Sequence, residues 1–555
     1  MLPVPFINHK ESNFDEICRN FRWRVPQKLN LAEYLCEKHG AGSSKVALYF
    51  EDENGAQRRA TFGELIRGSS KFANFLKAHG AKPGDRISMI LSQKLETVIS
   101  HLGIYKLGAI ALPLSFLFQK EALKYRLQNS GTKIVVIAEE DAHKVRELKD
   151  DLPDLEHLII IGKPGEGEIS FWGALEKASS EFEIYPTSAN DPAILAYTSG
   201  TTGPPKGAVH AHRFMLGNLP GFELSHNFFP KKNDVFWSPA DWAWGGGLFD
   251  ALFPCLYYGV PILAYRESKF DPERAFYMLE KYKVRSMFVF PSALRMMRQI
   301  KDIRAKHSLD IRSIMSAGES VGESVFAWGQ ETLCVSINEM FGQTEANYVV
   351  GNCSAIMDVK PGAMGKAYPG LSVEVIDEEG NLLPAGEVGE VVVDRSNPGM
   401  FLGYWQNEQA TKEKIVGNWW LMGDLVQKDE DGYLFYVGRK DDVICSAGYR
   451  IGPSEIENCL LHHPSVAEVA AVGSPHETRG EIVKAFIKLA PGYSPSDELA
   501  GELQTQVKKN LAFYAYPREV EFIEELPKTT TGKLRRVELK QREFEKKKGL
   551  ISSTS

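Results

Sequence analysis

The chain has 555 residues, of which 43% are hydrophobic and 25% are charged. This length and composition are typical of a soluble globular protein with more than one domain. The formal net charge of −7 supplies no basic field for nucleic acid or anionic lipid. Seven cysteines without a Cys-x-x-Cys pair argue against a disulfide framework and a zinc ribbon, and favour a reducing compartment.

The start of the chain has no basic segment followed by an apolar one, so we expect no signal peptide. The most apolar early stretch, about residues 97–113, is interrupted by His101, Lys106 and glycines. It is too short and too polar to cross a bilayer. The sequence therefore predicts a cytoplasmic protein without integral membrane association, and it does not define an oligomeric state.

Strands and helices alternate along the first two-thirds of the chain. Thr61 and Glu64 form a capping box that predicts a helix start. Strands are then expected over residues 86–91, 109–114, 133–138 and 158–161. A second series of strands is expected over residues 234–237, 260–263, 286–290 and 313–316. Such alternation is typical of parallel sheets covered by helices, so two of these sheets are predicted.

The pattern changes at about residue 361, where short strands separated by glycine turns predict a small antiparallel barrel. A compact unit of mixed strands and helices follows from about residue 438. The predicted fold class is α/β. It has a large N-terminal domain, residues 1–438, of two helix-flanked, mostly parallel sheets plus the barrel. A smaller, mobile α+β C-terminal domain, residues 439–555, completes the chain.

One loop, residues 197–207, is unusually rich in groups that bind anions. It follows a predicted strand over residues 193–197 and holds Thr198, Ser199, Thr201 and Thr202, with three glycines and Lys206. Glycines let backbone N–H groups approach an anion, and hydroxyls and a lysine add donors and charge. The pattern favours a polyphosphate site, although it is not the common P-loop. A flexible linker is the alternative, but the two prolines before Lys206 argue against it.

This loop resembles the signature of the adenylate-forming superfamily, which includes acyl-CoA synthetases, luciferases and the adenylation domains of peptide synthetases. Further motifs resemble those of the AMP-forming acyl-CoA synthetases and occur in the same order. They lie at residues 237–244, 316–320, 338–345, 420–424, 438–442, 447–451 and 527–533. The resemblance implies that a carboxylic acid attacks ATP to form an acyl-adenylate, and that coenzyme A then displaces AMP. ATP, Mg²⁺ and coenzyme A are the implied cofactor and substrates.

The resemblance also implies an ATP and AMP site. Its residues are Thr198, Ser199, Gly200, Thr201, Thr202, Gly203, Gly318, Glu319, Ser320, Asn338, Glu339, Met340, Phe341, Gly342, Gln343, Thr344, Asp424, Arg439 and Arg450. Lys206 and Thr344 would contact phosphates, and Glu345 would be the magnesium ligand, since Mg²⁺ prefers hard carboxylates beside phosphate oxygens. Asp424 would accept hydrogen bonds from the ribose hydroxyls. Taken alone, a helix-capping role for Glu345 and a turn role for Asp424 would be commoner.

The family pattern places the adenylation lysine at Lys533, with Lys528 as the competing assignment and a solvated lysine as the alternative from composition. The hinge between the two domains matches Asp441. The path of the coenzyme A arm would pass Gly448 and Tyr449. Lys508 falls where acetyl-CoA synthetases have an arginine for the coenzyme A phosphates, although lysine lacks the fork geometry of arginine.

The acyl pocket is assigned to Trp244, Gly245, Gly246, Ala317 and Gly342. The last four replace larger residues of acetyl-CoA synthetases, so we expect an acyl group larger than acetate, unless a neighbour such as Phe341 refills the space. Each buried methylene would contribute about 0.8 kcal/mol. Gly342→Trp is expected to shift the preference toward acetate. Whether the acyl group is medium-chain, branched or cyclic stays open.

The sequence therefore predicts an AMP-forming acyl-CoA synthetase that binds small molecules and no nucleic acid. The alternatives are an acetyl-CoA synthetase and an enzyme that passes its adenylate to a carrier-protein thiol. A luciferase-like oxygenase and a non-enzymatic nucleotide sensor are further alternatives, and the sensor is disfavoured because Lys533 and Glu345 are both present.

Overall fold

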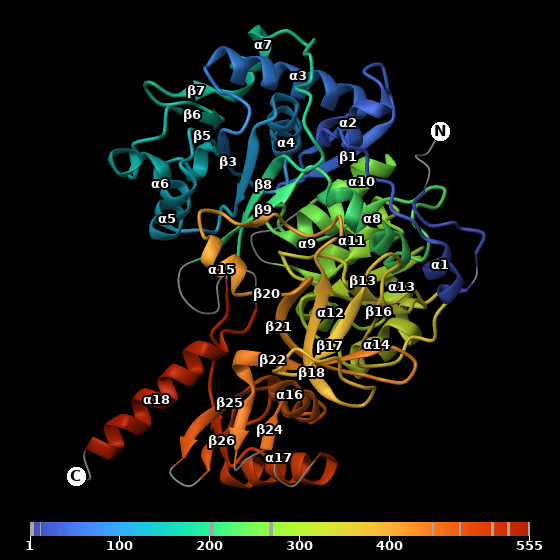
Figure 1. Ribbon diagram of the computed structural model, residues 1–555, viewed down its shortest axis with the longest axis vertical. Coiled ribbons are helices and arrows are strands. Elements are labelled where there is room, and N and C mark those ends of the chain that lie inside the picture. Colours follow the sequence, from blue (N-terminus) through green and yellow to red (C-terminus); the bar gives the residue numbers. More distant parts are fainter. Residues whose placement is uncertain are drawn as a thin grey trace.

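The computed structural model describes residues 5–11, 13–198, 205–265, 270–446, 449–476, 479–511, 515–529 and 533–552. Within these residues the strands form three sheets. Two belong to the large upper part of the molecule in Figure 1, and the third belongs to the C-terminal part below it.

The first sheet is mostly parallel and runs from residue 86 to residue 211, with one later strand at its edge. Its strands, in spatial order, are β19 (Gly403–Tyr404), β9 (Gly207–Ala211), β8 (Pro192–Tyr197), β4 (Ile110–Leu114), β3 (Arg86–Ile90), β5 (Ile134–Ala138), β6 (His157–Ile161) and β7 (Ile169–Ser170). The central strands β4 and β5 are buried along their whole length, because helices cover both faces of a parallel sheet.

The second sheet begins with parallel strands and continues into antiparallel ones. Its strands, in spatial order, are β17 (Val373–Ile376), β18 (Val388–Asp394), β21 (Trp419–Lys428), β22 (Leu434–Arg439), β16 (Ala363–Ala367), β15 (Val350–Gly351), β14 (Ile337–Phe341), β13 (Ser313–Ala317), β12 (Ser286–Phe288), β10 (Phe236–Trp237), β11 (Ile262–Ala264), β1 (Val46–Glu51) and β2 (Gln57–Thr61), with β20 (Ile415–Val416) on β21. The antiparallel strands that were predicted as a small barrel are thus hydrogen-bonded to this sheet through β15 and β16.

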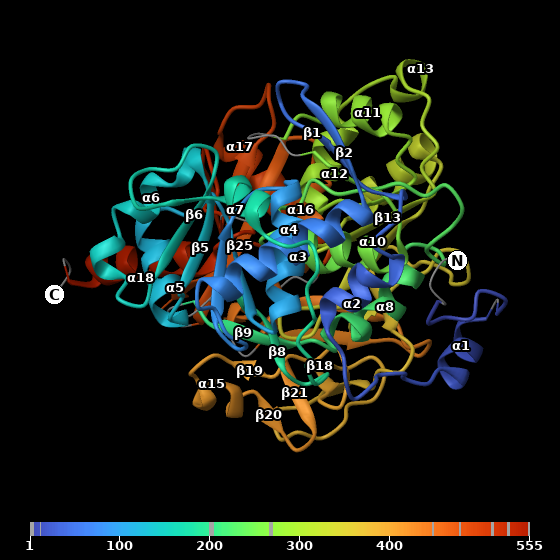
Figure 2. The same cartoon turned by 90° about the horizontal axis from the view of Figure 1, so that it is seen from above.

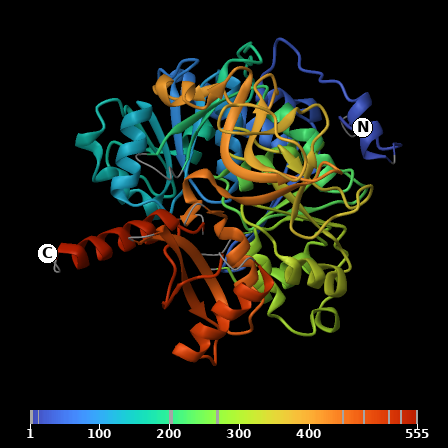
Figure 3. The same cartoon turned by 60° about the horizontal axis from the view of Figure 1, so that its bottom comes forward.

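The third sheet is formed by β24 (Tyr449–Ile451), β23 (Ile444–Ser446), β26 (Gly480–Leu489) and β25 (Val466–His476), with β27 (Glu519–Phe522) on β26. Two apolar cores of this part draw only on residues from 444 onward. Figure 3 shows this C-terminal part below the large part, with its last helix extending away from the body. The predicted α/β class with a large N-terminal part and a smaller α+β part is confirmed. The boundary at residues 438 and 439 stays a prediction.

Helices pack on both faces of the first two sheets, as Figure 2 shows from above. Those of the large part are α1 (Phe14–Asn20), α2 (Leu31–Leu35), α3 (Phe62–Ala78), α4 (Leu95–Leu107), α5 (Lys120–Ser130), α6 (His143–Arg146), α7 (Phe171–Lys177), α8 (Phe214–Ser225), α9 (Gly245–Gly247), α10 (Phe253–Tyr258), α11 (Pro272–Lys281), α12 (Pro291–Arg298), α13 (Ile303–Lys306), α14 (Glu323–Trp328) and α15 (Glu408–Lys412). The C-terminal part has α16 (Pro453–Leu461), α17 (Asp497–Asn510) and α18 (Arg536–Ser552).

Shorter turns complete the fold. The 3₁₀ helices are η1 (Glu37–His39), η2 (Glu139–Asp141), η3 (Lys149–Asp151) and η6 (Lys440–Asp442), and the π-helical turns are η4 (Leu248–Leu252) and η5 (Gly329–Leu333). The predicted capping box is present at the start of α3, where Thr61 and Glu64 bond each other's backbone N–H groups. No helix in the described ranges is long and apolar enough to cross a membrane.

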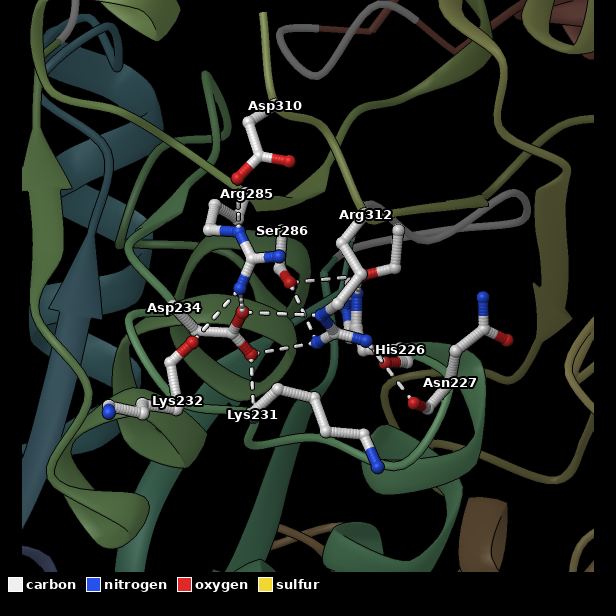
Figure 4. A network of polar contacts seen from close by, with 10 residues as sticks. His226, Asn227, Lys231, Lys232, Asp234, Arg285, Ser286, Asp310 and Arg312 are labelled. Carbon is white, nitrogen blue, oxygen red and sulfur yellow. Dashed lines mark hydrogen bonds and ion pairs between the residues drawn. The ribbon is translucent and has the colours of Figure 1, made fainter.

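A buried polar network holds together the amino ends of three parallel strands of the second sheet (Figure 4). The Asp234 carboxylate, before β10, accepts hydrogen bonds from Arg312, before β13, at 2.8 and 3.2 Å, and from Arg285, before β12, at 3.4 Å. Arg312 also donates to the carbonyl of His226 at 2.6 Å. A buried carboxylate is tolerated when it is paired in this way. The network therefore stabilises this edge of the sheet, and the opposite, carboxyl edge is left for a functional site.

Candidate active site

The predicted motifs gather at the carboxyl edge of the second sheet, where open α/β sheets bind their ligands. Gly318, Glu319 and Ser320 follow β13 directly, and the segment 342–345 follows β14. Gly318 has a φ of +94°, a left-handed backbone conformation that favours glycine. The chain turns sharply there, and this leaves the end of β13 open toward the C-terminal part.

The predicted phosphate loop connects β8 to β9 of the first sheet. At its base, the backbone N–H and the hydroxyl of Thr198 both donate to the carbonyl of Lys206, at 2.9 and 3.3 Å. Ser199, Gly200, Thr201, Thr202 and Gly203 lie outside the described residues. The base of the loop is thus pinned between two paired strands, as a phosphate-binding turn requires.

Tyr404 connects two of the predicted catalytic residues. Its hydroxyl donates to Glu345 Oε1 at 2.5 Å, and Lys206 Nζ lies 5.2 Å from the centre of its ring. Burial and the adjacent Glu345 carboxylate raise the pKa of Tyr404, so the hydroxyl keeps its proton and remains a donor. Sequence reasoning missed this residue. The only local signal was Gly403-Tyr404-Trp405, which becomes meaningful once β19 is seen to pair with β9 beside the loop.

Glu345 is suited to hold a magnesium ion together with phosphate oxygens. Its side chain is almost fully buried, and among the described residues only Tyr404 donates to its carboxylate. Within the same residues, no group of three or more His, Cys, Asp or Glu side chains gathers to hold a metal. Mg²⁺ is commonly bound through one or two carboxylates plus substrate phosphates, so a single free carboxylate oxygen beside the phosphate loop fits it.

Asp424 is buried on β21 and is held by three neighbouring side chains. Arg439, directly opposite on β22, donates at 3.1 and 3.2 Å, and Tyr436 donates at 3.3 Å. Gln343 bonds to the same carboxylate and donates to the carbonyl of Met422 at 2.7 Å. Burial raises the pKa of Asp424, while Arg439 acts in the opposite direction. The carboxylate is thus fixed in orientation, as a ribose acceptor would need to be.

Lys533 reaches this site from the C-terminal part. A Cβ placed on Gly318 would lie 3.6 Å from Lys533 Cε. Solvent reaches the residue, but the dense protein around its ammonium group lowers the pKa of Lys533 by desolvation. The carboxylates of Glu319, Asp424 and Glu345 act on it in the opposite direction. Lys533 is therefore directed at the centre of the predicted nucleotide site.

Lys528, the competing lysine, is directed elsewhere. It forms an ion pair with Glu468 on β25, within the C-terminal part. Thr529 N–H donates to the carbonyl of Lys533 at 2.7 Å, and Lys528 forms a bridge with Leu534. Lys533, and not Lys528, thus lies beside the large part.

The remaining predicted nucleotide residues have different environments. Asn338 is fully buried, and its amide bonds to the carbonyl of Ser225 at 2.8 Å and to Asn227 at 3.1 Å. Glu339 accepts from the N–H of Val321 at 2.7 Å, and burial raises its pKa to about 7. Met340 is buried, Phe341 packs against Tyr436, Thr344 and Ser320 are half-buried, and Glu319 pairs with Arg295. Asn338 thus has a structural role here, and its nucleotide contact stays a prediction.

The structure places few of the predicted coenzyme A and hinge residues in detail. Asp441 lies in η6, directly after β22, and Tyr449 and Arg450 lie on β24. Their side chains, and the whole of Gly448, lie outside what is described. Lys508 is exposed at the end of α17, with its Nζ 5.4 Å from the ring centre of Tyr516.

The five residues assigned to the acyl pocket lie on three segments. Trp244 packs edge to face on Phe118, with ring centres 5.5 Å apart, and Ala317 ends β13. A Cβ added at Gly245 would meet only Phe249, at the ordinary distance of 3.4 Å. One added at Gly246 would lie 2.6 Å from the Phe288 ring. Phe288 therefore already occupies the space that this small residue was expected to open.

Gly342 is small for a reason other than the acyl group. A Cβ there would lie 2.9 Å from Tyr348 N and 3.1 Å from Ala346 O, both backbone atoms. The turn after β14 folds back so closely that no side chain fits. The missing bulk at Gly342 is thus explained by this turn, and Gly342→Trp would distort it before it reached any pocket.

These features agree with the comparisons to known proteins. Residues 37–405 match the model of the AMP-binding enzymes, and residues 455–533 match that of the AMP-binding enzyme C-terminal domain. The chain is 34% identical to an acetyl-coenzyme A synthetase of Bacillus subtilis, covering 100% of this chain and 99% of that one. It is 35% identical to the mitochondrial acyl-coenzyme A synthetase ACSM3 of Rattus norvegicus, covering 96% and 94%. The chain belongs to the AMP-binding enzyme family.

Solved structures define the class more closely. An anthranilate CoA ligase in complex with anthranoyl-AMP superposes with a TM-score of 0.86 at 29% identity, covering 93% of this chain and 98% of that one. A Brucella canis acyl-CoA synthetase superposes with a TM-score of 0.75 at 32% identity, covering 97% and 100%. Together with the relatives, these matches identify an AMP-forming CoA ligase, for which ATP and coenzyme A are substrates.

Proposed function

We propose that this enzyme activates a carboxylic acid larger than acetate and transfers it to coenzyme A. An oxygen of the acid attacks the α-phosphorus of ATP, the bond to the bridging oxygen breaks, and pyrophosphate leaves. The coenzyme A thiol then attacks the acyl carbon, loses its proton, and AMP leaves. The observation that carries the proposal is the position of Lys533 beside Gly318, where the carboxylates of Glu345 and Asp424 act on its charge.

In the first step, negative charge builds on the α-phosphate and on the leaving pyrophosphate. Lys206 and the phosphate loop bind the outer phosphates, and Thr344 donates to the α-phosphate. Lys533 brings positive charge to the acid and the α-phosphate, where preorganised charge stabilises the transition state. Asp424 holds the ribose hydroxyls, and Arg439 keeps this carboxylate oriented. Glu345 would hold Mg²⁺, which when bound neutralises phosphate charge.

For the second step, we propose that the C-terminal part moves about the hinge at Asp441 and withdraws Lys533. A few residues suffice to absorb such a change. Gly448, Tyr449 and Arg450 would then line the path of coenzyme A. Lys508 and Arg518, both stacked on Tyr516, add positive charge for its phosphates. The domain boundary at residues 438 and 439 belongs to this proposal.

The acyl preference rests on Gly245, beside Trp244, where an added Cβ would meet only Phe249, at an ordinary contact distance of 3.4 Å. Acetate is the second candidate, because Phe288 fills the space at Gly246 and the backbone surrounds Gly342. A carrier-protein thiol is the alternative acceptor. We also keep a cytoplasmic location as a prediction.

The test is CoA-dependent AMP formation from ATP with a panel of acids: acetate, butyrate, 2-methylbutyrate, hexanoate, octanoate, benzoate and cyclohexanecarboxylate. We expect the highest kcat/KM above acetate. An acetate optimum would overturn the acyl preference and leave the reaction intact. Acid-dependent pyrophosphate exchange without any CoA-dependent turnover would assign the acceptor to a carrier protein.

A further inference from the structure

The turn that carries Thr344 and Glu345 is held by the side chains of every second residue, at positions 343, 345 and 347. Gln343 bonds to Asp424, and Glu345 accepts from Tyr404, so these two ties connect the turn to the ribose and phosphate sites. The third tie has no part in the reaction described above. Asn347 Nδ2 donates to Asp250 Oδ1 at 2.5 Å.

Asp250 is 4% exposed and lies in the π-helical turn η4. Such turns are uncommon and occur often at functional sites. Its carboxylate bonds to Asn347, whereas the hydroxyl of the adjacent Tyr348 bonds to Met315 Sδ at 3.4 Å. Tyr348 is a bulky residue with a φ of +50°, which a non-glycine residue rarely adopts. Asp250 therefore holds Asn347, the residue directly before this strained position.

The two ends of this bond lie close to residues that are assigned to the acyl pocket. Asp250 comes four residues after Gly246, on the helical segment that begins at Gly245. On the other side, Asn347 Cα lies 3.0 Å from the position of a Cβ on Gly342. The bond thus joins the segment with Trp244 and Gly245 to the turn with the α-phosphate and magnesium ligands.

Resting on the proposed function, we propose that Asp250 is a positioning residue that couples the acyl pocket to the adenylation turn. An acyl group packed against Trp244 and Gly245 fixes the start of the helical segment, and Asp250 passes this constraint to Asn347. Thr344 and Glu345 are then held in the reactive geometry. An acid too small to fill the pocket leaves this segment loose, so Thr344 and Glu345 are held less well and that acid is adenylated more slowly. The bond between Asp250 and Asn347 therefore contributes to selectivity.

This coupling makes a prediction that a hydrogen bond with a purely structural role does not. Without the bond, the rate of adenylation should fall most for acids that fill the pocket and least for acetate. The KM for ATP should change less than kcat, because the ribose and phosphate ties at Gln343 and Glu345 remain. The loss should also be reversed when donor and acceptor are exchanged, since the swapped pair restores the same link.

The experiment compares wild type with Asp250→Ala, Asp250→Asn, Asn347→Ala and the double exchange Asp250→Asn with Asn347→Asp. Pyrophosphate exchange is measured with acetate and with the best acid of the wild type, and melting temperature is recorded. Glu223→Gln is the control, because Glu223 is a fully buried carboxylate that bonds the N-terminal segment at residues 6 and 7. It should leave the ratio of kcat/KM between the two acids unchanged.

We expect Asp250→Ala and Asn347→Ala to lower kcat for the best acid at least tenfold and the ratio at least fivefold. The double exchange should restore both to within threefold. If Asp250→Ala does not fold, Asp250→Asn and the double exchange decide. An unchanged ratio in the folded variants, or a double exchange no better than Asp250→Asn, would overturn the coupling alone. A wild type that activates no acid would overturn the proposed function and the coupling with it.

Discussion

Removal of the Tyr404 hydroxyl tests how the magnesium ligand is positioned. Tyr404→Phe keeps the ring that packs on Phe401, with ring centres 5.1 Å apart, and on which Lys206 lies. It removes only the 2.5 Å bond to Glu345. A hydrogen bond to a charged group contributes about 1.5–3 kcal/mol. If this free energy is lost in the transition state of adenylation but not in the ground state, the rate of adenylation falls about 10- to 150-fold.

The assay is acid-dependent pyrophosphate exchange at several magnesium concentrations, with thioester formation from supplied acyl-adenylate as the second readout. We expect a lower kcat, a higher magnesium requirement and an unchanged thioester step. Tyr433→Phe is the matched control, since Tyr433 directly precedes β22 and its hydroxyl donates to the carbonyl of Asp358 at 2.6 Å, not to a residue of the site. A loss of less than threefold in Tyr404→Phe, or an equal loss in the control, would refute the reasoning.

Four further outcomes follow from the site. Lys533→Ala should abolish adenylate formation and leave thioester formation from supplied adenylate largely intact. Lys528→Ala, which removes an ion pair within the C-terminal part, should change neither half-reaction. Equal loss of both half-reactions in Lys533→Ala would contradict the assignment. Desolvation of its ammonium group lowers the pKa of Lys533 below the ordinary lysine value. Its charge is lost as pH rises through that lowered pKa, so pyrophosphate exchange should decline at a lower pH than an unperturbed lysine would cause, while the thioester step does not; parallel profiles would count against this. Gly245→Val, which adds bulk toward Phe249, should lower kcat/KM for the best acid relative to acetate at least tenfold, and unchanged chain-length selectivity would reject the pocket. Gly342→Trp, which the sequence alone predicts to shift the preference toward acetate, should instead lower activity with every acid, because its Cβ meets backbone.

Much of the fold could be predicted because its signals are local. The capping box at Thr61 and Glu64, the alternation of strands with helices, and the apolar β4 and β5 depend on neighbours in the sequence. The continuity of the barrel strands with the second sheet could not be predicted, since it depends on pairing between β16 and β22, some 70 residues apart.

The candidate site divides in the same way. Thr344 and Glu345 are found from their motif, because the chemistry needs those residue types next to each other. Tyr404 is 59 residues away from Glu345, and only the pairing of β19 with β9 brings it there. The smallness of Gly342 shows the opposite error. From the sequence alone, the small size of Gly342 is explained by a ligand. The close backbone that requires a glycine there is visible only in three dimensions.

The three alternate ties of the turn after β14 limit how the enzyme can be engineered. Gln343, Glu345 and Asn347 contact β21, β19 and η4 respectively. A deletion or insertion of one residue here would move all three off their partners together, so the nucleotide and acyl sites would fail as a unit. Chimeras that exchange acyl pockets between relatives should therefore transfer residues 244–250 and 342–348 as a pair, with both junctions outside the turn.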